Sequence, residues 1–431
     1  MSDKIEKYLS VGIDVGADFS EMSIALPSSE MCGNPFKIIH KSTESLNKAV
    51  EKIKSAADKH NVNVKIFMES TGVYHFALYC FLKENGFEVY VLNPLVTHAN
   101  RNYNIRKIHS DKFDSEKIAK LGLNKNLKTS DIPCDDILEI RNLLREYYSA
   151  MDMRTVYINK LKTQIRIVFP QYLQVFSKIT GAASMKLLEK YTLPCDILHA
   201  RKSSLISLIA KTSGKGTAAS EKIYEKLIKA ANDAAVFGHS LESNRTLIRM
   251  YIEFIKKLDE QCELLLSSIK NITEENTVSE ITKQVQLLQT IPGVGFLGAV
   301  TLIAEIGDFS RFKKPKQLYA YFGLDPEVKQ SGNFNGTKVK ISKRGSGYAR
   351  KVIYLIAMQS ISSNKNGVPK NSVLRDFYLE KCKTKSKMTA LGAVMHKIGN
   401  IVFAVLRDEK AFVLKTPQEH KLLYLKNINA A

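Results

Sequence analysis

The sequence predicts an α/β domain at the N-terminus, two long paired helices in the middle and a mainly α-helical domain at the C-terminus. Three observations lead to this prediction. Strand-like and helix-like runs alternate at the start of the chain, apolar residues then recur every seven positions, and a glycine-rich turn is followed by a strongly basic stretch. A chain of 431 residues is too long for one hydrophobic core, and we expect domains at 1–128, 129–283 and 284–431.

The N-terminal domain is predicted from short apolar strands separated by a turn and a helix. Residues 9–16 (LSVGIDVG) and 20–26 (SEMSIAL) are two strands joined by a short turn, which predicts a hairpin. Residues 64–70 form a third strand, residues 71–86 a helix, and residues 88–93 a further strand. These strands are apolar enough to be buried in an α/β layer.

The middle of the chain carries two seven-residue apolar repeats, which are typical of long paired helices. The first repeat begins near Asp135, is broken at Arg154 and ends near Pro170. We interpret the two repeats as antiparallel coiled-coil arms with an architectural or oligomerising role, and residues 171–240 as a small helical insert at their tip. The repeat positions are Ile137, Ile140, Leu144, Tyr147, Met151, Ile158, Leu161, Ile165 and Val168, then Ile248, Tyr251, Ile255, Leu258, Cys262, Leu265, Ile269 and Ile272.

The positive charge of the chain is concentrated near the C-terminus. The formal net charge is +21, and residues 311–400 contain 19 Lys and Arg against 4 Asp and Glu. An excess of this size favours a polyanion partner, most often nucleic acid, over a merely solvated surface. The six cysteines lack C-x-x-C pairs and zinc-ligand spacing, no apolar run approaches about 20 residues, and the N-terminus does not have a signal-peptide pattern. We therefore expect a cytoplasmic protein without a membrane span.

Residues 287–307 predict a helix, a Pro-Gly-x-Gly turn and a second helix. Gly293 and Gly295 permit a tight turn whose backbone N–H groups can sit against a phosphate. This pattern resembles the helix-hairpin-helix module, which holds the DNA backbone without reading its sequence. A plain helical turn that needs glycine is the other interpretation, and the basic stretch that follows favours DNA.

Four acidic residues of the N-terminal domain are candidate metal ligands. Asp14 interrupts an apolar strand, where an isolated carboxylate is costly unless it is paired or binds a metal. Glu69 ends a later strand, and Asp111 and Asp114 share one face at the start of a helix. Together they predict a site for two Mg²⁺ ions, which Mn²⁺ can replace, that activates a nucleophile and stabilises a leaving oxygen in phosphoryl transfer. Taken singly, each acid also fits a turn, a strand end or a helix cap.

A serine in the basic region is the candidate nucleophile. Ser331 lies in a predicted loop among cations that would stabilise the charge developing during attack on a phosphate. From the residues alone, Ser342 and Ser346 are equally good candidates. The candidate phosphate contacts of this region are Lys338, Lys340, Lys343, Arg344, Arg350 and Lys351.

Taken together, these motifs resemble the transposases of insertion-sequence family one-ten and the related Piv-type DNA invertases. The resemblance is carried by GIDVG with Asp14, MESTGVYH with Glu69, SDKFDSEKIA with Asp111 and Asp114, and by the later motifs IPGVG, IAEIGDFSRF, AYFGLDP, QSG and KISKRG. It covers nearly the whole chain apart from 171–240. The sequence departs from the family at Ser115, where alanine is usual.

The resemblance implies a ribonuclease-H-like (RuvC-like) N-terminal domain with an Asp-Glu-Asp-Asp site, a coiled-coil segment and a C-terminal domain whose nucleophilic serine corresponds to Ser331. It implies a recombinase that joins double-stranded DNA with a structured guide RNA. The coiled-coil arms would assemble the protein as a homodimer or homotetramer.

Three other functions stay open at this point. A RuvC-like nuclease would hydrolyse DNA with metal-activated water and leave the serine idle. A sugar kinase or actin-like ATPase would use GIDVG as a phosphate loop, but the second glycine-rich loop of those proteins is absent from the sequence and they have no place for a basic C-terminal region. An architectural DNA-binding protein would leave the four acids unexplained.

Overall fold

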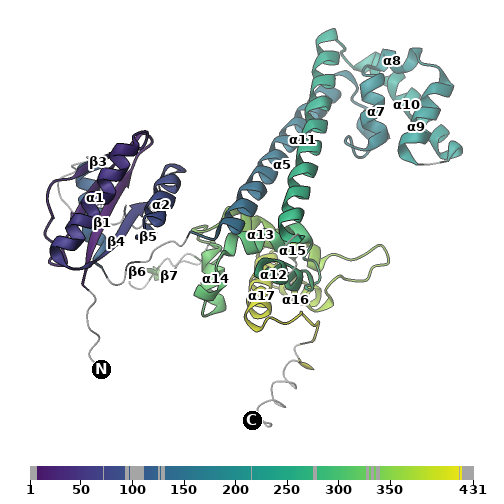
Figure 1. Cartoon of the computed structure of the whole chain (residues 1–431). Helices are drawn as coiled ribbons and strands as arrows, with labels where there is room; N and C mark the ends of the chain where they lie inside the picture. The colour runs from purple at the N-terminus through teal and green to yellow at the C-terminus, as the bar shows by residue number, and fades with distance from the viewer. Residues whose placement is uncertain are drawn as a thin grey trace. The chain divides into compact units, whose positions relative to one another are not determined.

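The computed structural model of the chain divides into two compact units, Met1–Ile132 and Pro133–Ala431, and each is described by itself (Figure 1). The described residues are 7–70, 72–92, 97, 111–124, 127, 132–214, 216–274, 279–326, 330–331, 334–335, 340–416 and 418–419.

The N-terminal unit is built on one mixed sheet with the strand order β3-β2-β1-β4-β5. The first three strands pair antiparallel, whereas β1 with β4 and β4 with β5 are parallel. This order and mixture of directions fit a ribonuclease-H-like α/β domain, and they confirm the predicted hairpin and later strands. The strands are Tyr8–Val15 (β1), Phe19–Ala25 (β2), Phe36–Ile39 (β3), Asn63–Glu69 (β4) and Glu88–Leu92 (β5).

The helices described in this unit are α1 (Thr43–His60), α2 (Tyr74–Glu84) and α4 (Asp111–Gly122). α2 and α4 occur where helices are predicted, but the sequence analysis predicts neither α1 nor β3. α1 begins after Ser42, whose side chain accepts a hydrogen bond from the Ser45 N–H. Its buried face consists of Ala49, Val50, Ile53 and Ala56.

Alternate residues of β1 face two different layers. The odd-numbered residues from Leu9 to Val15 belong to an apolar core that also contains residues of α1 and α2. Ser10, Gly12 and Asp14 point to the opposite face because successive strand residues alternate. α4 covers that face, and we call it the α4 face of the sheet.

Two glycines allow α4 to lie directly on the sheet. A Cβ on Gly12 would lie 2.1 Å from the Ala119 backbone nitrogen, and a Cβ on Gly122 would lie 2.3 Å from the Phe67 ring. Neither position accepts a larger residue unless α4 moves, because protein interiors leave no such overlap. The Tyr8 hydroxyl also donates a hydrogen bond to the Gly122 carbonyl oxygen at 2.8 Å.

Ser115, the residue that departs from the family pattern, is fully buried between α4 and the sheet. Its hydroxyl donates to the Lys112 carbonyl oxygen at 2.8 Å, and its Oγ lies 2.7 Å from the Ser23 Oγ. Since the Ser115 proton is already used, Ser23 is the donor between the two hydroxyls. The unusual serine therefore has its own partner on β2.

Replacing Ser115 by Ala is expected to destabilise the α4 face by about 1–3 kcal/mol, because the buried Ser23 hydroxyl loses its acceptor. The Ser23→Ala, Ser115→Ala double variant should recover most of this loss, since both polar groups are then absent. Native-state hydrogen exchange of the β1 amides measures the effect locally. Ser28→Ala, at an exposed position, is the control. If the double variant loses as much stability as the two single variants added together, the pairing of Ser23 with Ser115 is wrong.

Two long helices, α5 (Asp135–Val168) and α11 (Glu242–Glu274), form the arms of the second unit. They pack side by side and antiparallel (Figure 1). Gln164 accepts a hydrogen bond from Asn244 at 2.9 Å near one end, and Arg154 forms an ion pair with Asp259 further along. The residue that breaks the predicted repeat thus has a charged partner on the opposite helix. Repeat positions that are fully buried include Ile137, Leu144, Ile165, Ile248, Ile255 and Ile269.

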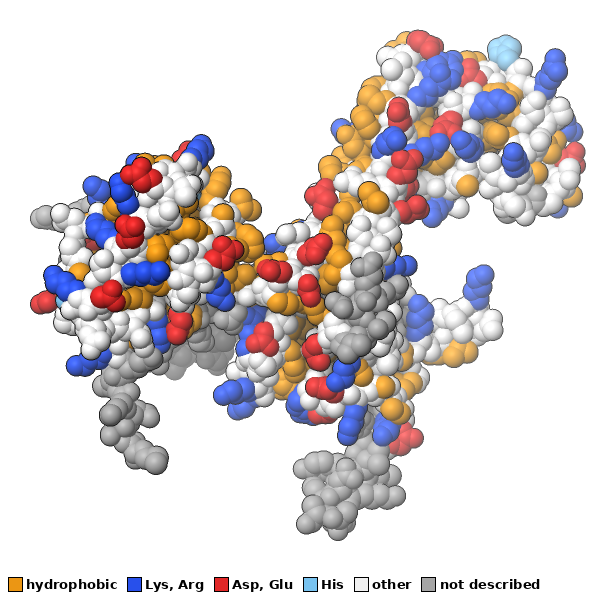
Figure 2. All heavy atoms as spheres, in the orientation of Figure 1, with side chains coloured by type: hydrophobic (Ala, Val, Ile, Leu, Met, Phe, Trp, Pro, Cys, Tyr) orange, Lys and Arg blue, Asp and Glu red, His pale blue; other side chains and the backbone are white. Residues whose placement is uncertain are grey.

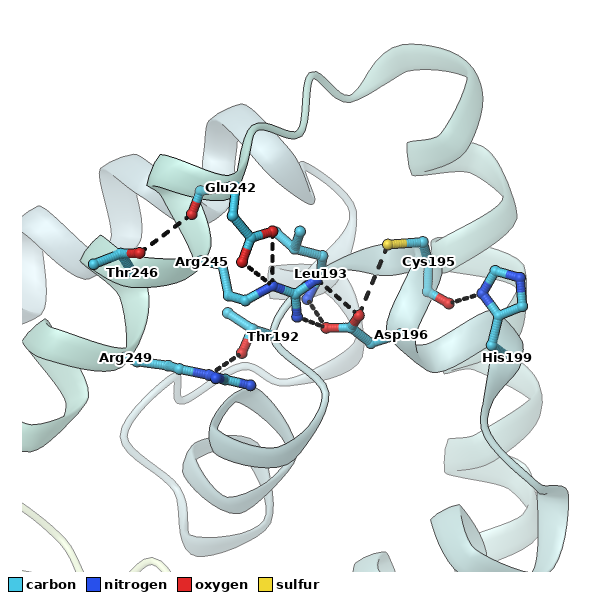
Figure 3. Close-up of polar contacts among 9 residues, drawn as sticks. All are labelled: Thr192, Leu193, Cys195, Asp196, His199, Glu242, Arg245, Thr246 and Arg249. Carbon is cyan, nitrogen blue, oxygen red and sulfur yellow. Dashed lines mark hydrogen bonds and ion pairs between the residues drawn. The ribbon is translucent and has the colours of Figure 1, made fainter.

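The segment between the arms folds into short helices that share a core with the arm ends. A polar network joins α8 to α11, where the Arg245 guanidinium binds both oxygens of Asp196 and also contacts Glu242 (Figure 3). Burial alone would raise the pKa of Asp196, but the hydrogen bonds from Arg245 and from the Leu193 N–H together with the charge of Arg245 hold that pKa below its usual value. We call this segment the tip module. It consists of α6 (Tyr172–Val175), α7 (Ala182–Lys190), α8 (Pro194–His199), α9 (Lys202–Ser213) and α10 (Thr217–Phe237).

The remaining helices pack around the base of the arms. Ile137, Ile140 and Leu144 of α5 belong to the same core as residues of α13, α15 and α17. α12 and α13 are joined by the Pro-Gly-x-Gly turn, as predicted. The elements are α12 (Glu280–Gln289), α13 (Phe296–Ile306), a 3₁₀ turn (Phe309–Arg311), α14 (Pro315–Tyr321), β6 (Gln330–Ser331), β7 (Phe334–Asn335), α15 (Gly347–Ile361), α16 (Ser372–Cys382) and α17 (Lys387–Asp408).

Among the described residues, α17 is the one helix with the length and apolar composition needed to cross a membrane. More than half of its most apolar window is buried within the second unit, and its residues Val394, Ile398 and Val402 are fully enclosed there. Core helices of water-soluble domains have the same composition. Its hydropathy is therefore accounted for by packing.

Candidate metal centre and nucleophile

Asp14 and Glu69 lie side by side at the carboxyl ends of two parallel strands. The β1–β4 pairing runs in register to Ile13 and Met68, so that Asp14 and Glu69 are the next pair along. Neighbouring strands are about 4.8 Å apart, and paired residues point to the same face. Glu69 is buried and Asp14 is half-buried. The sheet therefore brings two of the four predicted acids together on the α4 face.

The direction of α4 carries Asp111 and Asp114 toward the same end of the sheet. The C-terminal end of α4 lies over the start of β1, as the bond from Tyr8 to Gly122 shows. Its first turn therefore lies toward the end of β1 that bears Asp14. Asp114 is buried and forms an ion pair with Lys117 at 3.4 Å, whereas Asp111 is exposed. Acids in a first helical turn are also stabilised by the helix dipole.

These acids lie toward one edge of the sheet, but their side chains are not arranged as a set of metal ligands in the described part of the chain. Across the described residues, no three Asp, Glu, His or Cys side chains lie close enough together to hold a metal ion. Clustered carboxylates repel one another until a cation offsets their charge. Hard oxygen donors of this kind are the ligands that Mg²⁺ and Mn²⁺ prefer.

The α4 face carries one further acidic residue, Glu21, which was not predicted as a metal ligand. Glu21 on β2 lies directly opposite Asp14, with its side chain buried, and its Oε2 has no hydrogen-bond partner among the described residues. A buried carboxylate oxygen without a hydrogen bond, on the same face of the sheet as Asp14 and Glu69, is consistent with a cation-binding site on that face. The signal available in the sequence was the β1–β2 hairpin register itself, which pairs position 14 with position 21.

Ser331 belongs to the second unit. Its backbone forms the two-residue strand β6, which pairs antiparallel with β7. A loop is predicted here, whereas Gln330 pairs with Asn335 and Ser331 with Phe334 in a short antiparallel ladder. Its side chain lies outside the described residues.

The two rival serines have structural hydrogen bonds. The Ser342 hydroxyl donates to the Asp325 carboxylate at 2.5 Å, and the Ser342 N–H donates to the Asp325 carbonyl oxygen at 2.8 Å. Ser346 caps α15, where its Oγ accepts a hydrogen bond from the Ala349 N–H at 3.1 Å. Ser342 is thus joined to Asp325, and Ser346 to the first turn of α15.

Comparison with known protein families decides the affiliation of the chain. A family model described as "Transposase IS116/IS110/IS902 family" matches residues 285–373, and an IS110 model of the DEDD transposase type matches residues 11–170. Together the two models match more than half of the chain. The chain belongs to the IS110 family of transposases. The resemblance inferred from the motifs is confirmed, and the DEDD model agrees with a requirement for divalent metal.

Individual relatives of this IS110-family chain agree with the family models. It is 29% identical over 193 residues to the transposase for insertion sequence element IS1111A of Coxiella burnetii, which is 44% of this chain and 50% of the relative. It is 30% identical over 165 residues to the pilin gene-inverting protein of Moraxella bovis, which is 38% of this chain and 47% of the relative. The chain thus spans about half the length of these curated relatives.

The predicted phosphate contacts of this transposase fall into two groups. Lys340, Lys343 and Arg344 are exposed, whereas Lys338 lies outside the described residues. The Arg350 guanidinium donates to the carbonyl oxygens of Phe322 and Gly345, and Lys351 forms an ion pair with Asp152 of α5 at 3.0 Å. Lys340, Lys343 and Arg344 are therefore the stronger candidates for DNA contact.

The two glycines of the α12–α13 turn also differ. Gly293 has a positive φ of 102°, and a Cβ there would lie 2.4 Å from the Ser360 Oγ. Packing against α15 therefore requires glycine at this position, independently of any phosphate. Gly295 is exposed with open space around it and is the N-cap of α13. Of the two, Gly295 is the one whose surroundings leave room for a phosphate.

Proposed function

We propose that this chain is a DNA transposase that cleaves and rejoins the strands of a mobile element. Asp14, Glu69, Asp111 and Asp114 would hold two Mg²⁺ ions, and Ser331 would be the nucleophile. The observation that carries the proposal is the parallel register of β1 and β4, which sets Asp14 beside Glu69 at the edge reached by the first turn of α4.

Divalent cations at such a site would supply Lewis-acid stabilisation of the phosphate and of the leaving oxygen. The carboxylates of this chain would hold the cations, and Glu69 and Asp114 are themselves buried. Basic residues of the C-terminal domain such as Lys343 and Arg344 would hold the DNA backbone.

The serine step would conserve the energy of the phosphodiester bond. A bond forms between the Ser331 Oγ and the phosphorus as the bond from phosphorus to one sugar oxygen breaks. The serine loses its proton, and the released sugar oxygen gains one and becomes a hydroxyl group. A hydroxyl group of another DNA strand can then attack the phosphoserine, which regenerates the serine and joins the strands.

The partners of the proposed enzyme are double-stranded DNA from the element and the target, a structured guide RNA and further copies of the chain. The guide RNA follows from family resemblance. We propose that copies associate as a dimer or tetramer through the arms, on which hydrophobic side chains are exposed (Figure 2). Val156, Phe254 and Leu264 are among the exposed hydrophobic residues. We place the reaction in the prokaryotic cytoplasm, where the DNA of insertion elements is located.

The decisive experiment incubates the protein and its co-purified RNA with labelled DNA in Mg²⁺ and looks for a covalent protein–DNA adduct. An adduct together with joined strands is expected. Cleavage without an adduct would instead indicate a RuvC-like nuclease that uses water. Nuclease treatment and sequencing of the co-purified RNA test guidance separately, and purification free of any discrete RNA would contradict it.

Replacing Lys343 and Arg344 together by Ala is expected to reduce the salt dependence of DNA affinity. Each lost phosphate contact flattens the slope by about 0.9 log units per log unit of salt, so the pair should remove about 1.8. A titration of DNA binding at several salt concentrations measures the slope. Lys54→Ala with Lys59→Ala, two exposed positions on α1, is the matched control and should leave it unchanged. An affinity that does not vary with salt would show that the basic region faces another partner.

A further inference from the structure

Glu21 is a buried acid that forms no ion pair with any described residue. Its residue surface is 5% exposed, and one carboxylate oxygen lacks any hydrogen bond among the described residues. An uncompensated buried carboxylate is costly, and like charges directly opposite in a sheet destabilise it further. Glu21 has both disadvantages, because Asp14 lies directly across from it on β1.

Two described cations near Glu21, Lys37 and Lys117, have other contacts. Lys37 is opposite Glu21 on β3, but its ammonium group lies 3.6 Å from the centre of the Phe19 ring. No ion pair joins Lys37 to Glu21 in the described part of the chain. Lys117 of α4 pairs with Asp114. The free energy lost by burying Glu21 must therefore be recovered from something other than these side chains.

We propose that Glu21 is a fifth carboxylate of the metal centre and positions a water ligand of a bound divalent cation. This inference rests on the proposed function, since it assigns Glu21 to the same site. Mg²⁺ keeps several of its waters when it binds to proteins. A carboxylate that accepts hydrogen bonds from those waters orients them and strengthens cation binding. Glu21 is a positioning residue in this scheme.

Glu21→Gln tests the proposal because glutamine keeps the shape of the side chain and removes its charge. Calorimetric titration of the full-length chain with Mg²⁺ should show an affinity about 10-fold to 100-fold weaker than wild type. The melting temperature in EDTA should rise, since one buried like charge is gone, and the increase on adding Mg²⁺ should shrink. A purely structural glutamate predicts the reverse, with a lower melting temperature and unchanged affinity, and that result would overturn the proposal.

Two further variants make each outcome decisive. Glu51→Gln, at an exposed position of α1, is the matched control and should bind Mg²⁺ like wild type. Asp14→Asn tests the metal centre itself. If Asp14→Asn weakens binding while Glu21→Gln does not, the role of Glu21 alone is wrong. If wild type shows no saturable Mg²⁺ binding, the metal centre and the role of Glu21 both fail.

If Glu21→Gln does not fold, Glu21→Asp provides a second test of the proposal. Aspartate keeps the charge and withdraws the carboxylate by one methylene group. Weaker Mg²⁺ binding with a preserved fold supports the proposal, and wild-type affinity contradicts it.

Discussion

Asp14→Asn is expected to reduce strand cleavage by at least about 100-fold while DNA binding stays close to wild type. Loss of an outer partner of a metal ligand already costs about 10-fold to 100-fold, and Asp14 is proposed as a ligand itself. Its position beside Glu69 makes it the centre of the acidic edge. Cleavage of labelled DNA in Mg²⁺, together with a binding titration, measures the two effects separately.

The matched control for this prediction is Asp18→Asn. Asp18 lies in the turn after β1, is exposed and forms a surface ion pair with Lys41 at 2.7 Å. Removal of such a surface ion pair changes the stability of the protein little, so cleavage should stay at the wild-type level. Full activity of Asp14→Asn in Mg²⁺ would remove Asp14 from the metal centre.

Ser331→Ala is expected to bind DNA and RNA normally, to form no covalent adduct and to give no joined product. The phosphoserine ester is the intermediate that preserves bond energy for rejoining. Without it the strands cannot be rejoined, however tightly the DNA is bound. Separation of protein-linked DNA under denaturing conditions measures the adduct. Ser346→Ala is the informative control, because loss of the α15 cap should cost about 0.5–2 kcal/mol of stability yet leave the adduct intact.

Mixing Ser331→Ala with Asp14→Asn asks whether one active site draws on two copies of the chain. Some activity should return if the acids of one protomer act with the serine of another. An adduct formed by Ser331→Ala itself would place the nucleophile elsewhere, and Ser342 and Ser346 would then be tested next. Loss of the adduct without rescue by mixing keeps Ser331 as nucleophile and removes the support for shared sites.

The sequence predicted those parts of the fold in which the side-chain pattern is strong. The apolar strands of the sheet and the seven-residue repeats of the arms were recognisable because burial requires their spacing. α1 and β3 were missed. β3 is a four-residue edge strand with one buried side chain, whereas α1 had a recognisable cap at Ser42 and buried residues at helical spacing.

The candidate site was predicted in part, for a physical reason. Asp14 and Glu69 stand out as single acids at the ends of apolar runs. Glu21 does not, because SEMSIAL has the alternation of a strand with one solvated face, and only contact with α4 buries that face. The packing role of Gly293 against Ser360 was likewise invisible, since the two residues are far apart in the sequence.

The tip module is attached to the arms at two neighbouring points, so it could be gained or lost as one unit during evolution. The N–H of His239 donates to the carbonyl oxygen of Ile167 at 3.1 Å, so the chain leaves α5 and returns to α11 at adjacent points. Insertion of a domain at such a place adds little to the free energy of folding beyond the entropy of closing one loop. Leu161 and Ile252 are nevertheless buried in the core shared with the insert. In a relative that lacks the insert, the part of these side chains that the insert covers would be exposed to solvent.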